Sequence, residues 1–204
     1  MTGQEPDRFY YKDQRLDLVG IKGKRLLIPS DFGIETYMSA TSCRRGYIMR
    51  YKIIENQLIL EGFWFNSKTG DLPEINGNKS IKLSEETAEE GGYFHDMFQF
   101  EYRNLEKKIP FKGSILLAKD LIRSKYVHMG FQSPTAYKTV LKFEFKDGII
   151  VNVQDKSEAA KKARKKGDPK QIKPKSMDPR DIEDWIMKRF SLNIDFYKKK
   201  GNGV

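Results

Sequence analysis

The sequence is poor in the residues that most enzymes and metal proteins use for chemistry. Of its 204 residues only one is cysteine, Cys43, and two are histidine, His95 and His128. A single cysteine cannot form an internal disulfide, and two separated histidines without further cysteines lack the ligand spacing of a zinc site. We therefore predict no metal centre and no cofactor.

Long apolar runs and familiar catalytic motifs are also missing. No stretch approaches the roughly 18 apolar residues that a membrane-spanning helix needs, and the polar start "MTGQEPDRFYYKDQ" has no apolar core of a signal peptide. We expect no membrane association and a cytoplasmic location. The chain contains no GxxxxGK(S/T) phosphate loop, no GxGxxG, no HExxH and no GxSxG. The sequence therefore indicates no particular reaction.

What the chain does contain is enough apolar surface for a folded core. Hydrophobic residues make up 38% of the sequence and aromatic residues 12%, which is too much for a chain disordered throughout. The length suits one domain, or two small halves that share one core.

The net charge of +10 is concentrated in two short segments. Residues 156–175 contain nine Lys/Arg against two acidic residues, and Lys198, Lys199 and Lys200 add three more positive charges. The rest of the chain balances, with 26 basic and 26 acidic residues. We expect a neutral body, a basic linker or arm over 156–177 and a basic tail over 198–204.

The basic segment has two interpretations. As a flexible arm it would neutralise the phosphates of nucleic acid or another polyanion, weakly and without sequence choice. Lysine outnumbers arginine by eight to one and no aromatic residue is interleaved, so base stacking and base reading are not indicated. The alternative is a solubilising linker. The binding residues predicted here are Lys161, Lys162, Arg164, Lys165 and Lys166.

Two parts of the chain resemble each other at an offset of 90 residues. Residues 22–52 and 112–142 share six identities without a gap. Both segments continue into alternating β-branched and aromatic residues around a turn, which contains Asn56 in the first and Asp147-Gly148 in the second. Such a pattern is typical of β-hairpins. We infer an internal duplication.

The resulting fold prediction is α+β, mainly β. We expect two similar antiparallel β-rich halves, over 1–92 and 93–155, packed as one pseudo-twofold unit. The first half would end in a short acidic helix over 84–92, "SEETAEEGG", capped by serine and stopped by glycine.

A second helix is predicted over 178–197. Asp178 suits the N-cap and Pro179 the first helical position. Apolar residues recur along one face, and we expect that face to be buried against the sheet, with a partner protein as the less favoured surface. The residues on that face are Ile182, Trp185 and Ile186, with Arg189 or Phe190.

Two segments could hold functional side chains. In "TSCRRGY" the thiol of Cys43 precedes Arg44 and Arg45, and positive charge lowers the pKa of a partly exposed cysteine; the alternative is a half-buried cysteine at the start of a strand. The stretch "YVHMGFQSPTAY" combines His128 with Gln132 and Ser133 in a polar loop. Its alternative is an ordinary turn.

These features leave two functional hypotheses. The first is a non-enzymatic intracellular binding or accessory protein, such as a bacterial immunity, inhibitor or defence-associated factor, that recognises a protein or an anionic partner. The second is a hydrolase or nucleotide-processing enzyme, in which His128 acts as general acid or base and Arg44 or Arg45 holds a phosphate-containing substrate. Convergence of His128, Cys43 and Arg44 in one cleft would favour the enzyme. Placement on separate surfaces would favour the binding protein.

Overall fold

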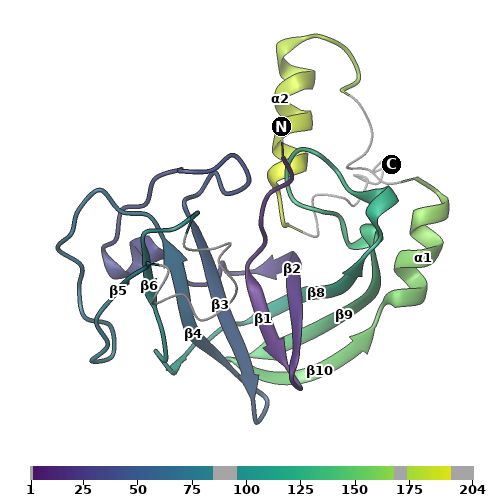
Figure 1. Cartoon of the computed structure of the whole chain (residues 1–204). Helices are drawn as coiled ribbons and strands as arrows, with labels where there is room; N and C mark the ends of the chain where they lie inside the picture. The colour runs from purple at the N-terminus through teal and green to yellow at the C-terminus, as the bar shows by residue number, and fades with distance from the viewer. Residues whose placement is uncertain (1, 85–95, 168–173, 194–204) are drawn as a thin grey trace.

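The computed structural model describes residues 2–84, 96–167 and 174–193 (Figure 1). The predicted tail over 198–204 and all but the first residue of the predicted acidic helix lie outside these ranges. The fold is mainly β with two α-helices, as the sequence predicts.

The strands belong to one connected sheet in the order β10-β9-β8-β2-β1-β3-β4-β6-β5, with β7 paired to β4. They are β1 (Arg8–Tyr11), β2 (Gln14–Gly23), β3 (Tyr47–Ile54), β4 (Gln57–Phe65), β5 (Ile81–Lys82), β6 (Phe100–Tyr102), β7 (Lys107–Lys108), β8 (Gly113–Leu121), β9 (Tyr137–Lys146) and β10 (Ile149–Asp155). The helices are α1 (Ser157–Lys165) and α2 (Pro179–Phe190), with short 3-10 turns η1 (Pro29–Phe32), η2 (Arg123–Lys125) and η3 (Pro134–Ala136).

Both predicted hairpins are confirmed. Strands β3 and β4 are joined by Glu55-Asn56, and β9 and β10 by Asp147-Gly148. All four turn residues have positive φ, the conformation of the type I′ turn, whose twist matches that of the paired strands. Asn, Asp and Gly adopt it at low cost, which is why the sequence locates these turns.

The sheet curls around a core of aromatic and aliphatic side chains. Strand β10 meets β4 at the pair Ile149↔Gln57, so strands at distant positions in the sheet order come together at one end. Strands β1 and β3 run parallel, and the other strand pairs in the described residues are antiparallel. The core includes the fully buried rings of Phe9, Tyr51 and Phe63.

The proposed repeat is matched only in its hairpins. Strand β2 ends at Gly23, whereas β8 begins at the matching Gly113. The leucines that follow Gly23 therefore lie outside a strand, and the aligned leucines that follow Gly113 lie inside one. Strand β1 separates β2 from β3, but β8 lies directly beside β9. Strands β6 and β7, assigned to the second half, pair with β4 of the first. The duplication and the twofold axis therefore remain predictions.

Helix α1 lies within residues 156–177, the segment predicted as a basic linker or arm. Its side chains at 157, 160 and 164 contact the body: the Val140 amide donates to Ser157 Oγ, and Ala160 is buried. Arg164 donates to the carbonyl oxygens of Thr135 and Tyr137. The sequence gives little sign of this docking because a serine, an alanine and an arginine do not form an apolar stripe.

Helix α2 begins as predicted but packs differently. Asp178 caps it by accepting a hydrogen bond from the Arg180 amide at 2.9 Å, and Pro179 is the first helical residue. No residue of α2 is buried, and Ile186 is 40% exposed. The predicted burial of Ile186 against the sheet is therefore wrong, and Trp185 is only half-buried.

Helix α2 remains exposed because the bonds that attach it to the body lie near its C-terminal end. The Phe131 amide donates to Arg189 O at 2.9 Å, and the Ile21 amide donates to Leu192 O at 2.7 Å. These bonds hold the last turn and the following residues, while the rest of the helix stands away from the sheet (Figure 1). Each helix in the described part of the chain is too short and too polar to cross a membrane.

Candidate functional site

The first residues of the chain connect the two loops that carry the predicted site residues. We call residues 2–7 the N-terminal strap. The Glu5 amide donates to Ser42 O at 2.8 Å, and the Gln4 amide donates to Gly130 O at 2.9 Å. The Gln4 side chain also accepts from the Arg44 amide at 2.9 Å. The strap therefore brings the arginine loop (41–45) and the histidine loop (126–133) to the same end of the molecule.

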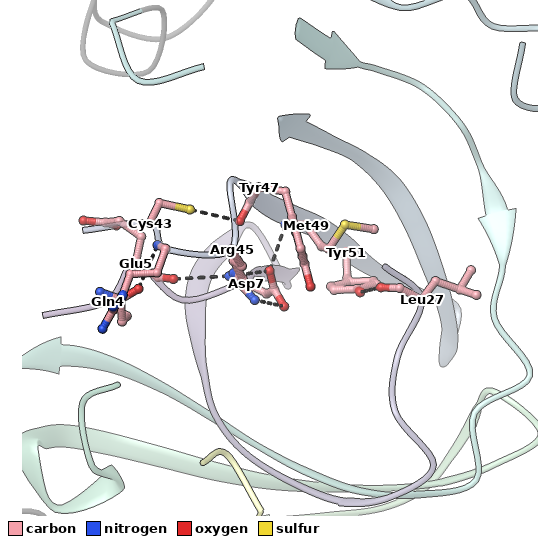
Figure 2. Close-up of polar contacts among 10 residues, drawn as sticks. Gln4, Glu5, Asp7, Leu27, Cys43, Arg45, Tyr47, Met49 and Tyr51 are labelled. Atoms are coloured by element: carbon pink, nitrogen blue, oxygen red, sulfur yellow. Dashed lines mark hydrogen bonds and ion pairs between the residues drawn. The ribbon is translucent and has the colours of Figure 1, made fainter. Parts of the chain in front are cut away.

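Arg45 belongs to the framework of this end and not to a substrate pocket. Figure 2 shows its guanidinium directed at Asp7, with Nη2 to Oδ1 at 2.8 Å and Nη1 to Oδ2 at 3.0 Å. Asp7 also accepts the Met49 amide at 2.8 Å. Burial, the largest single effect, lowers the pKa of Arg45, but Asp7, Tyr47 and Cys43 together outweigh it, so the pKa is raised overall. A charge paired in this way ties the strap to β3 and is not available to an anionic substrate.

Cys43 lies before β3 and is more deeply buried than the half-buried cysteine of the alternative interpretation, with 2% of its surface exposed. Its side chain is buried among Ile48, Trp64, Met97 and Phe98, and the thiol donates to Tyr47 O at 3.2 Å (Figure 2). Burial raises the pKa of the thiol, against the lowering effect of Arg45. Because the thiolate is the nucleophile, this environment argues against the predicted catalytic role.

The polar residues of the histidine loop serve mainly to hold the loop itself. Gln132 is buried and exchanges two hydrogen bonds with the backbone of Val127, both at 2.9 Å. Ser133 caps η3 by accepting from the Thr135 amide. Of the three predicted site residues in this loop only His128 is exposed, with its ring edge-on to Tyr126 at 5.1 Å between centroids. Gln132 and Ser133 thus act in this structure as positioning residues for the loop.

Arg44 is the member of the cysteine-arginine motif that faces solvent. Its guanidinium lies 5.5 Å from the ring centroid of Phe190 in the last turn of α2. Loop 41–45 and α2 therefore share one surface. The Arg44 and His128 loops lie at the same end of the molecule. The Cys43 thiol, however, points into a separate apolar cluster.

The basic residues of α1 divide into two groups. Arg164 points inward and anchors the helix. The side chains of Lys161, Lys162, Lys165 and Lys166 are exposed. The predicted basic segment is therefore, at least over 157–165, an ordered surface.

No sequence pattern predicts the interaction between two carboxyl groups, Glu5 of the N-terminal strap and Asp17 of β2. Burial raises the pKa of Glu5 and of Asp17, while Arg8 lowers both. Asp17 lies opposite Arg8 in the β1–β2 register and accepts from the Tyr137 hydroxyl at 3.2 Å. Isolated acidic residues in a strand look like ordinary solvated positions, so the pair appears only once the strands are placed.

A pocket of about 290 Å³ lies elsewhere, beside the loop that follows β4. Ser67, Lys68 and Thr69 line it together with Lys82 and Phe98. None of the predicted site residues contributes to it. Within the three described ranges, no three histidine, cysteine or acidic side chains gather closely enough to hold a metal ion.

Comparison with protein-family models, with curated proteins and with solved structures finds no match to this chain.

Proposed function

We propose that the protein is a non-enzymatic binding protein, of the accessory or inhibitor kind, that recognises another protein through α2. The observation that carries the proposal is the exposure of apolar side chains on a helix whose last turn is held. Ile186 is 40% exposed and Met187 is 59% exposed. We call Arg44, Ile186, Met187 and Phe190 the α2 surface.

The spacing on α2 suits recognition of a helix by an apolar groove. Ile186 and Phe190 are four residues apart, and Met187 and Phe190 are three apart, which is the spacing by which helices present anchors to a groove. Because the Arg189 and Leu192 carbonyls are already hydrogen-bonded to the body, little further ordering is needed on binding, and the entropic cost of association is smaller.

Arg44 indicates which side chains border the groove of the partner. Its guanidinium stacks near Phe190 and is exposed, so it can pair with a carboxylate of the partner. Arginine and aromatic residues are the side chains most often found to dominate protein interfaces. We therefore propose a partner with an apolar groove bordered by acidic residues.

The enzyme hypothesis receives less support from the same contacts. The thiol of Cys43 is buried with a raised pKa, and Arg45 is neutralised by Asp7. In the described residues no carboxylate pairs with His128 to orient its ring as a general base. A single exposed histidine without such a partner is a weak basis for catalysis.

We also propose that the scaffold arose by duplication, with the two halves related by a pseudo-twofold axis. The matching Lys-Gly sequences meet at the β2–β8 ladder, where Gly23 pairs with Gly113. Antiparallel pairing of two equivalent residues has a local twofold axis, which supports the proposal, together with the two similar hairpins.

The α2 proposal is tested with a matched pair of double variants. Ile186→Ser/Met187→Ser removes two α2 side chains that are 40% and 59% exposed; Ile149→Ser/Val151→Ser removes two on β10 that are 43% and 60% exposed. A partner captured from a lysate by the wild type is identified, and its Kd for each variant is measured. We expect at least a tenfold loss for the α2 variant, as for a side chain worth more than about 1.4 kcal/mol, and less than threefold for the β10 variant.

Two results would contradict the proposal. Equal loss in both variants would show non-specific apolar capture, and an unchanged Kd in the α2 variant would place the interface elsewhere. A second copy of this chain is the other possible partner. Sedimentation of the wild type alone tests it, because a dimer that the α2 variant disrupts would show that two copies bind each other through α2. Melting temperatures of both variants control for folding.

A further inference from the structure

Helix α1 is fixed to the body by one side only. Its contacts come from positions 157, 160 and 164, which a helix of 3.6 residues per turn places on one face. The Val140 amide donates to Ser157 Oγ at 3.1 Å, and Ala160 is 7% exposed. Arg164 donates to Thr135 O and to Tyr137 O, each at 2.6 Å. The orientation of the opposite face follows from these contacts.

The solvent-facing sides of α1 and its C-cap carry four exposed lysines, which we call the lysine face. Lys161 and Lys165 are four residues apart, as are Lys162 and Lys166. Lys161 has an exposed ion pair with Glu158 at 3.3 Å, which solvent largely screens. Lys162, Lys165 and Lys166 have no acidic partner in the part of the chain that the structure describes.

The lysines repel one another, while their position at the C-terminal end of α1 suits the negative end of the helix dipole. Like charges at i,i+4 destabilise a helix, and here two such pairs lie side by side. The body is neutral overall, so this charge is not a general feature of the surface but a local one that α1 holds in place. A bound polyanion would remove the repulsion.

The composition of α1 distinguishes among anionic partners. Helices that lie on a membrane insert large apolar side chains such as Trp, Phe or Leu, whereas the apolar residues of α1 are Ala159, Ala160 and Ala163. The one arginine is used as an anchor, so no guanidinium remains on α1 to read a base edge in the bidentate manner. Lysine ammonium groups alone suit phosphates as point charges.

We infer that the lysine face of α1 binds the phosphate backbone of nucleic acid without sequence preference. This is a second binding surface, formed by α1 and independent of the α2 surface. Binding releases counterions from the nucleic acid, so the affinity falls as salt rises. The slope of log K against log salt is proportional to the number of phosphate contacts.

The test compares two triple variants of the full chain that have the same net charge. Lys162→Gln/Lys165→Gln/Lys166→Gln removes the unpaired lysines of the lysine face. Lys24→Gln/Lys112→Gln/Lys146→Gln removes three exposed lysines around the Gly23↔Gly113 end of the sheet, where Gly113 also pairs with Phe145. Both lower the net charge from +10 to +7. Glutamine is as good a helix former as lysine, and circular dichroism checks that α1 persists.

Labelled 20-base-pair duplex DNA and a single strand of equal length are titrated at salt concentrations from about 50 to 200 mM, where counterion release is readily resolved. For duplex, we expect the α1 variant to reduce the slope of log K against log salt by up to about 2.7, at about 0.9 per lost phosphate contact. Its affinity at the lowest salt should fall at least tenfold. The control variant should change the affinity less than threefold.

Equal weakening by both variants would mean that only net charge matters and would overturn the inference. So would unchanged binding by the α1 variant, or absence of duplex and single-strand binding by the wild type. Polyglutamate and vesicles with anionic lipid are titrated in parallel. Binding to either one in preference to nucleic acid, lost in the α1 variant, would reassign the lysine face to an acidic protein or to a membrane.

Discussion

Asp17 is a residue at which burial and ionisation act against each other. It lies on β2 opposite Arg8, under the hydroxyl of Tyr137. Burial raises its pKa, and the lowering effects of Arg15, Tyr137 and Arg8 do not cancel that rise. Proton uptake is therefore easier in the folded chain than in the unfolded chain. The contribution of Asp17 to stability is fully present below the unfolded pKa of about 3.9 and is lost as pH rises through the folded pKa.

Asp17→Asn is expected to be stabilised relative to the wild type at pH 7, and this advantage should shrink as the pH falls toward 3. An asparagine cannot ionise but can still accept the Tyr137 hydrogen bond. Urea unfolding at pH 3, 5 and 7 measures the difference.

Asp31 is the matched control because its shift has the opposite sign. Hydrogen bonding from Arg25 lowers the pKa of Asp31, so its contribution is present above the unfolded pKa and lost as pH falls. Asp31→Asn should therefore be destabilised at pH 7 and approach the wild type at pH 3. If both variants changed with pH in the same direction, the assignment of burial as the dominant effect on Asp17 would be wrong.

At the scale of elements, one side chain holds the C-terminal end of α1. Arg164 makes both hydrogen bonds from the end of α1 to the body, and hydrogen bonds to charged groups contribute about 1.5–3 kcal/mol. We expect Arg164→Ala to lower the free energy of unfolding by about 2 kcal/mol and to remove hydrogen-exchange protection from the amides of 157–165. Lys165→Ala, one position along and exposed, should change stability by less than about 0.5 kcal/mol. Similar effects from the two substitutions would show that α1 is not held by Arg164.

At the scale of the whole molecule, the β2–β8 ladder joins the strands before residue 24 to those after residue 112. At its end the backbones approach so closely that a Cβ on Gly113 would lie 2.2 Å from Lys22 O. We expect Gly113→Ala to cost about 3 kcal/mol, because it combines a clash with unfavourable φ.

Gly77 provides the comparison for that substitution. It also has positive φ, but a Cβ there would meet nothing within 4 Å. Gly77→Ala should therefore cost only about 1 kcal/mol, from the backbone conformation alone. Thermal or urea unfolding distinguishes the two, and equal losses would mean that the close approach at Gly113 relaxes without cost.

The sequence alone determined the features that depend on a few neighbouring residues. Asn56 and Asp147-Gly148 located the hairpin turns because these residue types tolerate positive φ, and Asp178-Pro179 located the start of α2 because a cap and a first-turn proline act locally. The mainly β composition followed from alternating β-branched and aromatic residues.

The surroundings of the charged and reactive side chains depend on the fold. Arg45 pairs with Asp7, which is 38 residues away in the chain, and Arg164 finds carbonyl groups 29 and 27 residues away. The apolar stripe of α2 was visible in the sequence, but its exposure depends on hydrogen bonds from Phe131 and Ile21 to the helix end. Burial and ion pairing depend on which distant segments the strand order brings together, and no local pattern contains that order.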